Sequence, residues 1–272
     1  MITKWQAYTS LLQQQAYSLS GGLPLWIRLQ PICSTLEVTE ITRVPIHKGR
    51  GLLKIMETDV RILLPEMDLK AASQSRSSRT LGMYTPTERF VIAHELGHLI
   101  LLRNGAPKPF GASEYWKLEE VCNDFARRLL INEEAINERL GRGDYSASSL
   151  LKICAGLALD AKVPWSAAAY RISESLPDTG FFRLEPKQYG LKIVVSTFAN
   201  KDRTGWIGSG KKVRQKDPLY KVLFEIKGMP GAQGQIPANV FSDILDLNLN
   251  SDCAVYHDQY GIKVAIVKAI FQ

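Results

Sequence analysis

The segment from Arg89 to Leu102 constrains the fold and chemistry of this chain more than any other. It places His94, Glu95 and His98 in the pattern H-E-x-x-H within an otherwise mostly apolar run. In a helix, two histidines four residues apart project from one face, one turn apart, so both imidazoles can bind a single zinc ion. Glu95 points to one side of that face, where a general base can reach a water molecule on the metal. The pattern predicts a metal-binding helix.

The ends of this helix carry their own signals. Thr85 and Glu88 form a T-x-x-E capping box, and Pro86 falls at the first helical position, where its missing N–H costs nothing. Asn104 and Gly105 mark the end of the helix. Apolar side chains occupy most of its sides, so we expect it to be buried. Burying an unpaired glutamate is costly, which favours a metal site over two core histidines that only hydrogen-bond each other.

A third protein ligand is needed, because catalytic zinc sites usually carry three protein ligands and a water. The longer motif with a third histidine requires His where the chain has Asn104. A second amphipathic helix is expected over residues 113–131, and its apolar stripe fixes which side chains face the core. In that register Glu119 lies on the inward shoulder, with Glu120 as the next candidate. Asn123, one turn further, can hydrogen-bond a ligating imidazole or Glu119.

Two stretches of the chain resemble the ImmA/IrrE metallopeptidases. The first spans residues 88–98, and the second spans residues 119–130, where the family pattern reads E-x-x-A-N-x-F-A-x-x-L-L-M-P. The resemblance implies that Glu119 is the third zinc ligand. The chain departs from the pattern at Cys122 and at residues 131–132, which lie outside the expected metal shell. The likeness covers about residues 25–175, with no specific match beyond.

The expected fold class is α+β. We expect a zincin-like metallopeptidase core, consisting of a small sheet, the H-E-x-x-H helix and a helical bundle, followed by a β-rich C-terminal module. The predicted domains are residues 1–178, which include a trailing helix pair, and residues 179–272, with a sensory or partner-docking role. The helix pair resembles a helix-turn-helix. No basic recognition face is visible in it, so a packing role is favoured over direct nucleic-acid binding.

Periodicity and turn residues predict the remaining elements. Helices are expected over residues 4–19 and 26–36, and residues 73–80 form a polar loop. Residues 201–217, with six basic and two acidic side chains, form a flexible basic loop, and residues 258–261 form a hairpin turn. The expected strands are residues 37–44, 51–56, 60–64, 191–197, 220–226, 253–257 and 262–270.

Composition narrows the class further. The net charge is +7, and most of the excess of basic residues lies in residues 181–272, which hold 13 Lys and Arg against 8 Asp and Glu. An excess of this size is more typical of a soluble surface than of a nucleic-acid site. The four cysteines are far apart and form no C-x-x-C pair, as expected for core residues in a reducing compartment. No signal-peptide pattern or membrane-span run is visible, so we expect a cytoplasmic protein without a membrane partner.

These observations lead to the expectation of a zinc-dependent endopeptidase with Glu95 as general base. The resemblance implies a protein substrate, a helix-turn-helix transcriptional repressor cleaved in a regulated stress response. The alternative is a zinc-binding regulatory protein without turnover, although a structural site needs no base. A peptide deformylase is disfavoured because its upstream cysteine ligand motif is missing. The candidates for a further oxyanion donor are Tyr84, Tyr115 and His257.

Overall fold

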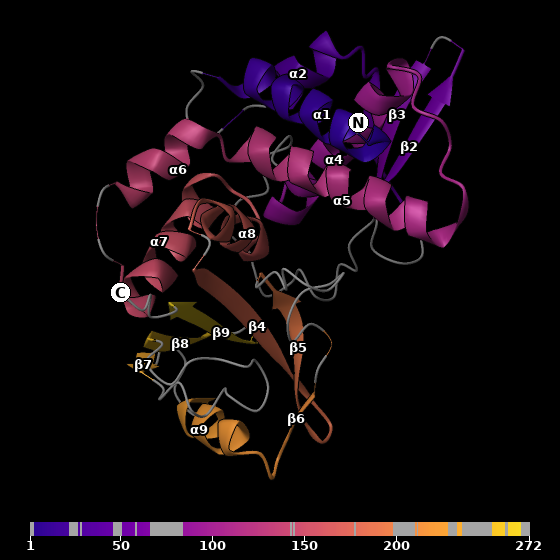
Figure 1. The fold of residues 1–272 in the computed structure, drawn as a ribbon. Helices are drawn as coiled ribbons and strands as arrows, with labels where there is room; N and C mark the ends of the chain where they lie inside the picture. The colour runs from indigo at the N-terminus through magenta and orange to yellow at the C-terminus, as the bar shows by residue number, and fades with distance from the viewer. Residues whose placement is uncertain are drawn as a thin grey trace. The chain divides into compact units, whose positions relative to one another are not determined.

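The described residues form helices and two sheets, which confirms the α+β class (Figure 1). The chain divides into two compact units: unit 1 is Met1–Ala135 with Leu159–Pro164, and unit 2 is Ile136–Ala158 with Trp165–Gln272. The domain boundary at residue 178 stays a prediction. Among the described helices, none is both long and apolar enough to span a membrane. The computed structural model describes residues 3–21, 27, 29–45, 51–57, 59–65, 84–141, 143, 145–176, 178–197, 210, 212–227, 233–235, 252–258 and 261–267.

Unit 1 combines a three-stranded sheet with helices that pack on it and on one another. The sheet has the order β1-β3-β2, in which the central β3 pairs parallel with β1 and antiparallel with β2, so that β2 lies at an edge. Helix α4 packs on β2 and β3, and both α4 and α1 pack against α5. The elements are α1 (Lys4–Ser20), α2 (Leu29–Thr35), β1 (Glu40–Val44), β2 (Leu52–Met56), β3 (Asp59–Pro65), α4 (Pro86–Arg103) and α5 (Gly111–Leu130).

Helix α4 begins and ends where the sequence predicts. The Thr85 hydroxyl accepts a hydrogen bond from the Glu88 amide at 3.2 Å, and the Glu88 carboxylate accepts one from the Thr85 amide at 2.7 Å. Arg43 of β1 donates two further hydrogen bonds to Glu88, at 2.6 and 3.1 Å. Burial acts to raise the pKa of Glu88, but these hydrogen bonds outweigh it and the pKa is lowered. The cap therefore also ties α4 to the small sheet.

Helices α4 and α5 approach each other closely at Gly97. A Cβ atom at this position would lie 3.1 Å from Cδ1 of Phe125 and 3.4 Å from Cα of Cys122. Phe125 and Cys122 are both fully buried in the α5 stripe that the sequence predicts to face the core. The missing side chain lets α5 lie against α4 between the two histidines of the motif. A larger residue at this point would force the helices apart or leave side chains strained.

Unit 2 contains a six-stranded sheet with the order β6-β5-β4-β9-β8-β7, in which all neighbouring strands are antiparallel. Its core includes Phe182 and Val264 together with Leu223 of α9, all buried. The helices α7 and α8, the trailing pair of the sequence analysis, fall largely in this unit. The elements are α7 (Ala147–Asp160), α8 (Trp165–Ser175), β4 (Thr179–Lys187), β5 (Gly190–Ser196), β6 (Lys212–Arg214), α9 (Pro218–Lys227), β7 (Gln233–Gln235), β8 (Asp252–Asp258) and β9 (Gly261–Val267). Helix α6 (Glu133–Leu140) begins in unit 1 and ends in unit 2, since the division falls between Ala135 and Ile136.

The strand predicted over residues 220–226 is wrong, because this segment lies in helix α9. Leu219 and Leu223 are buried four residues apart, the spacing of one helix face, and Pro218 stands at the helix start. Part of the predicted basic loop is also ordered, since residues 212–214 form β6. Strand β4 and helix α6 were not predicted. Residues 73–80, 201–209, 211 and 259–260 lie outside the described residues, and of the expected strand 262–270 the structure describes residues up to 267.

Candidate metal centre

The side chains of His94, His98 and Glu119 converge between α4 and α5. Each offers one ligand atom, and these atoms lie within 4.8 Å of one another; in the described part of the chain no other group of three His, Cys, Asp or Glu does so. The Nε2 atoms of the two histidines are 3.1 Å apart. Glu119 oxygens lie 3.5 Å from Nε2 of His94 and 3.3 Å from Nε2 of His98.

These separations fit a zinc ion. Ligand atoms at about 2.0–2.2 Å from a tetrahedral zinc lie roughly 3.3–3.6 Å from one another. Two imidazole nitrogens and one carboxylate oxygen are a donor set of catalytic zinc sites, which leave the fourth position open. The three side chains are 13, 18 and 16% exposed, so they are largely shielded but still reach the surface of a cleft. The residues present can therefore hold zinc and leave a position for substrate.

Glu119 is in the ionised form that a metal requires. Burial acts to raise its pKa, but the hydrogen bonds and charges of His94 and His98 outweigh burial, and the pKa lies well below its ordinary value. A carboxylate held ionised between two imidazoles is ready to bind a cation.

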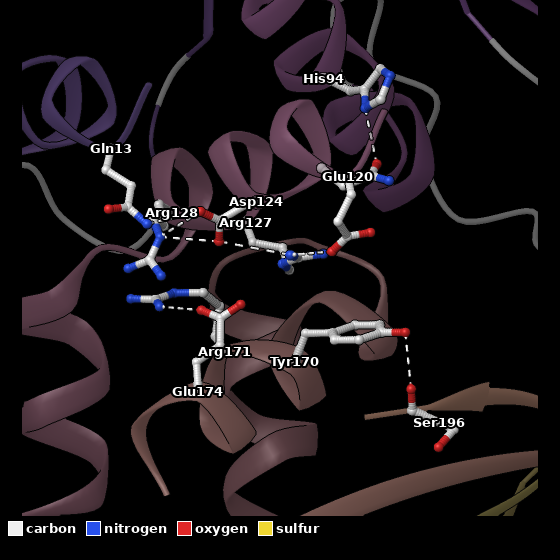
Figure 2. Close-up of polar contacts among 11 residues, drawn as sticks. Gln13, His94, Glu120, Asp124, Arg127, Arg128, Tyr170, Arg171, Glu174 and Ser196 are labelled. Carbon is white, nitrogen blue, oxygen red and sulfur yellow. Dashed lines mark hydrogen bonds and ion pairs between the residues drawn. The ribbon is translucent and has the colours of Figure 1, made fainter. Parts of the chain in front are cut away.

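Glu120, the neighbouring acid, points elsewhere. Its side chain is 51% exposed, and a carboxylate oxygen lies 3.1 Å from a guanidinium nitrogen of Arg127 (Figure 2). Asp124 of the same helix accepts hydrogen bonds from Nε of Arg128 at 3.0 and 3.1 Å. The structure brings Glu119 to the two histidines and leaves Glu120 to an arginine. The role of Glu119 as a ligand remains a proposal.

Asn123 holds one of the histidines. Its Oδ1 atom lies 2.9 Å from Nδ1 of His94. A carbonyl oxygen only accepts, so His94 donates from Nδ1, and a metal would take the place of the proton on Nε2. Asn123 follows Glu119 by one helical turn, and the two therefore act from the same side of α5.

Replacing Asn123 by alanine is expected to weaken zinc binding by about 10- to 100-fold, because the ring of His94 loses the group that fixes its tautomer and orientation. Titration against a chromophoric zinc chelator measures this. Ser113→Ala, an exposed substitution near the start of the same helix, is the matched control and is expected to leave the affinity unchanged. Wild-type affinity in Asn123→Ala would show that the hydrogen bond does not position the ligand.

Glu95 lies at the side of the cluster and is 7% exposed. Burial raises its pKa, with the charge of Glu119 adding to the rise and the charges of His94 and His98 opposing it. The backbone N–H of Leu53 in β2 donates a hydrogen bond to its carboxylate. Next to it, a Cβ atom on Gly51 would come within 3.0 Å of Oε1 of Glu95, so only glycine fits there without displacement. The edge of the sheet thus fixes this carboxylate.

A cavity of about 640 Å³ extends over the cluster. One wall was not foreseen from the sequence, namely the apolar side chains of α4 and α5 outside the core stripe. Tyr115 lines the cavity, whereas the ring of Tyr84 lies 5.9 Å from the guanidinium carbon of Arg43 and is not among the lining residues; His257 belongs to β8 of unit 2. The lining residues are Gly51–Leu53, Phe90, Val91, His94, Glu95, His98, Leu101, Leu102, Ala106–Pro109, Tyr115, Trp116, Leu118–Glu120 and Asn123.

The ligand cluster lies in a part of the chain that matches a known protein family. Residues 83–173 match the family model of Peptidase M78, the IrrE N-terminal-like domain, which confirms the resemblance to the ImmA/IrrE family and indicates a metal-dependent, peptidase-type domain. A solved structure described as a Mycobacterium tuberculosis transcriptional regulator has a TM-score of 0.51 at 12% sequence identity, and the match covers 96% of this chain and 76% of that one. That likeness concerns the fold alone. No curated protein matches the chain.

Proposed function

We propose that this protein is a zinc-dependent endopeptidase with a zincin-like core, and that it cleaves a specific helix-turn-helix transcriptional repressor. The observation that carries the proposal is the convergence of His94, His98 and Glu119, with the buried carboxylate of Glu95 beside them in one cleft. The family match at residues 83–173 supports a metal-dependent peptidase. The cytoplasmic location and the repressor substrate rest on the sequence and the family resemblance.

The chain's own residues supply the positions that peptide hydrolysis requires. His94, His98 and Glu119 would hold zinc, which acts as a Lewis acid that polarises the scissile carbonyl and lowers the pKa of water. Glu95 takes the proton from the attacking water and delivers it to the leaving amine. Burial raises the pKa of Glu95, which makes it a stronger base than an exposed glutamate and helps it to carry that proton. The hydrogen bond from the Leu53 amide holds the Glu95 carboxylate in place beside the ligand cluster.

Strand β2 offers a place for an extended substrate segment. It is an edge strand of the small sheet, and its apolar side chains are exposed, with Leu52 at 53% and Ile55 at 49%. A free sheet edge can pair with an extended chain through main-chain hydrogen bonds, while pockets select the side chains. Because β2 also holds Glu95, a segment bound along it would pass the catalytic base. This arrangement favours turnover over the alternative of a regulatory zinc protein without activity.

Zinc-loaded protein is expected to cleave a helix-turn-helix repressor encoded near its gene at one or a few sites and to leave casein almost intact. Both substrates are incubated with metal-replete protein and analysed by gel electrophoresis and mass spectrometry, with a chelator-treated sample as control. Rapid, unselective digestion of casein would refute the restricted substrate while leaving the zinc peptidase in place. Failure of metal-replete protein to cleave either substrate would favour the regulatory alternative, with residues 179–272 as its docking or sensory part.

A further inference from the structure

The cavity continues beyond the metal ligands towards the connection between α4 and α5. The two helices are antiparallel, since His94 contacts Asn123 and His98 contacts Glu119 one turn later. One more turn along α4 reaches Leu101 and Leu102, and one turn back along α5 reaches Tyr115 and Trp116. All four line the same cavity, together with Pro107 and Pro109 of the connection. The cavity thus has a second compartment, next to the ligands and formed by different residues.

The compartment is apolar although much of it faces solvent. Trp116 is 57% exposed and Leu102 is 47% exposed, whereas Leu101 beneath them is buried. The rings of Tyr115 and Trp116 meet edge to face, with centroids 5.4 Å apart. Large apolar side chains gathered in a concave site and left open to water mark a place where an apolar group binds. Neither the metal site nor the packing of α5 on α4 requires them.

The edge strand β2 also lines the cavity, through Leu52 and Leu53. In an extended chain, successive side chains point to opposite faces, so a substrate segment along β2 turns every second side chain towards the face of the sheet on which α4 packs. When its scissile carbonyl lies at the metal ligands, a side chain next to that bond faces the compartment one helical turn away. The compartment is therefore placed to read a residue that adjoins the bond.

We propose that this compartment is the specificity pocket of the enzyme, and that it takes a large apolar side chain, such as leucine, methionine or phenylalanine, directly beside the scissile bond. Trp116 and Leu102 are the residues that select it. The inference rests on the proposed peptidase function and deepens it by naming the class of bond that is cut. Charged side chains are disfavoured because an apolar pocket strips them of water. Lys108 of the connection also lines the cavity, but it is exposed, so an ion pair with it would gain little.

The first test is digestion of a proteome-derived peptide mixture by metal-replete protein, with the cleaved bonds read by mass spectrometry. We expect leucine, methionine, phenylalanine or isoleucine beside most cleaved bonds. On one such peptide, Trp116→Ala is expected to lower kcat/KM by about 10-fold or more, the scale of lost contacts in an apolar pocket, while Trp116→Phe restores most of it. Tyr17→Ala removes a similarly exposed ring, 65% exposed, on α1 outside the cavity and serves as the control. Cleavage without side-chain preference would overturn the proposal.

A second test does not depend on turnover. Two hydroxamates that differ only in carrying a leucine or an aspartate side chain are titrated into zinc-loaded protein by calorimetry. We expect the leucine compound to bind at least about 10-fold more tightly, and this ratio to shrink in Trp116→Ala at unchanged zinc content. Equal affinities would overturn the pocket even if peptides are cleaved. A clear leucine preference without any peptidase activity would uphold the pocket and contradict the proposed function.

Discussion

Glu95→Gln is expected to lose peptidase activity by a factor of about 10²–10⁴ in kcat/KM, the usual contribution of a general base. The amide has nearly the size of the carboxylate but cannot accept the proton of the attacking water. Glu95 is buried beside the ligand cluster without belonging to it, so the variant keeps its ligands and its bound zinc. Steady-state kinetics on the cleaved substrate, with zinc content measured on the same sample, separates these two effects.

Glu134→Gln makes the same chemical change at an exposed site on α6 and is expected to leave activity unchanged. The structure also makes a geometric demand on Glu95→Gln. The introduced side-chain amide would have to turn its oxygen towards the Leu53 N–H, whose hydrogen bond the carboxylate now accepts. Full activity in Glu95→Gln would eliminate the proposed mechanism, because no other described carboxylate lies beside the cluster in the same position.

Glu119→Ala is expected to weaken zinc binding by more than about 100-fold, beyond the loss caused by removing a residue that only orients a ligand. It removes the only anionic ligand and leaves two neutral imidazoles. Glu120→Ala is the matched control, since it deletes the adjacent carboxylate, which is 51% exposed and pairs with Arg127. We expect Glu120→Ala to change zinc affinity little, because its carboxylate pairs with Arg127 and not with the two histidines.

Competition with a zinc chelator measures both affinities. Burial acts to raise the pKa of the Glu119 carboxylate, but the two histidines lower it further than burial raises it, so the group is ionised at neutral pH. Its loss therefore removes a full negative charge from the cluster. If Glu120→Ala lost zinc and Glu119→Ala kept it, the register of α5 around the metal would be displaced by one residue.

The metal helix could be predicted from sequence because its signals are local. The capping box of Thr85 and Glu88 and the H-E-x-x-H spacing lie within one segment, and the structure shows both as expected. The choice of Glu119 over Glu120 follows from the apolar stripe of α5, whose members Cys122 and Phe125 are fully buried. The fit of α5 against Gly97 could not be foreseen, since it depends on two helices meeting.

Other parts of the structure required tertiary information. Residues 220–226 are rich in β-branched and aromatic side chains, which favour a strand. The spacing of Leu219 and Leu223 also matches a helix, and both are buried in the core of unit 2, where the segment forms α9. The order β1-β3-β2 leaves β2 at an edge of the sheet. The hydrogen bond from the Leu53 amide of β2 to Glu95 of α4 joins two elements that are far apart in the sequence, so no local pattern could predict it. Trp116 falls outside the apolar stripe of α5. A large apolar residue off the buried face of a helix was the signal in the sequence that could have indicated an apolar cleft.

Metal analysis of the purified protein tests the central claim most directly. Wild-type protein and Glu95→Gln are each expected to contain one tightly bound zinc per chain, with peptidase activity in the wild type alone. His94→Ala and His98→Ala are expected to contain none, because each removes a nitrogen from a three-ligand set. Two results would contradict this assignment: wild-type protein that retains no zinc after incubation with excess zinc, or a variant that keeps its full zinc content after loss of either histidine.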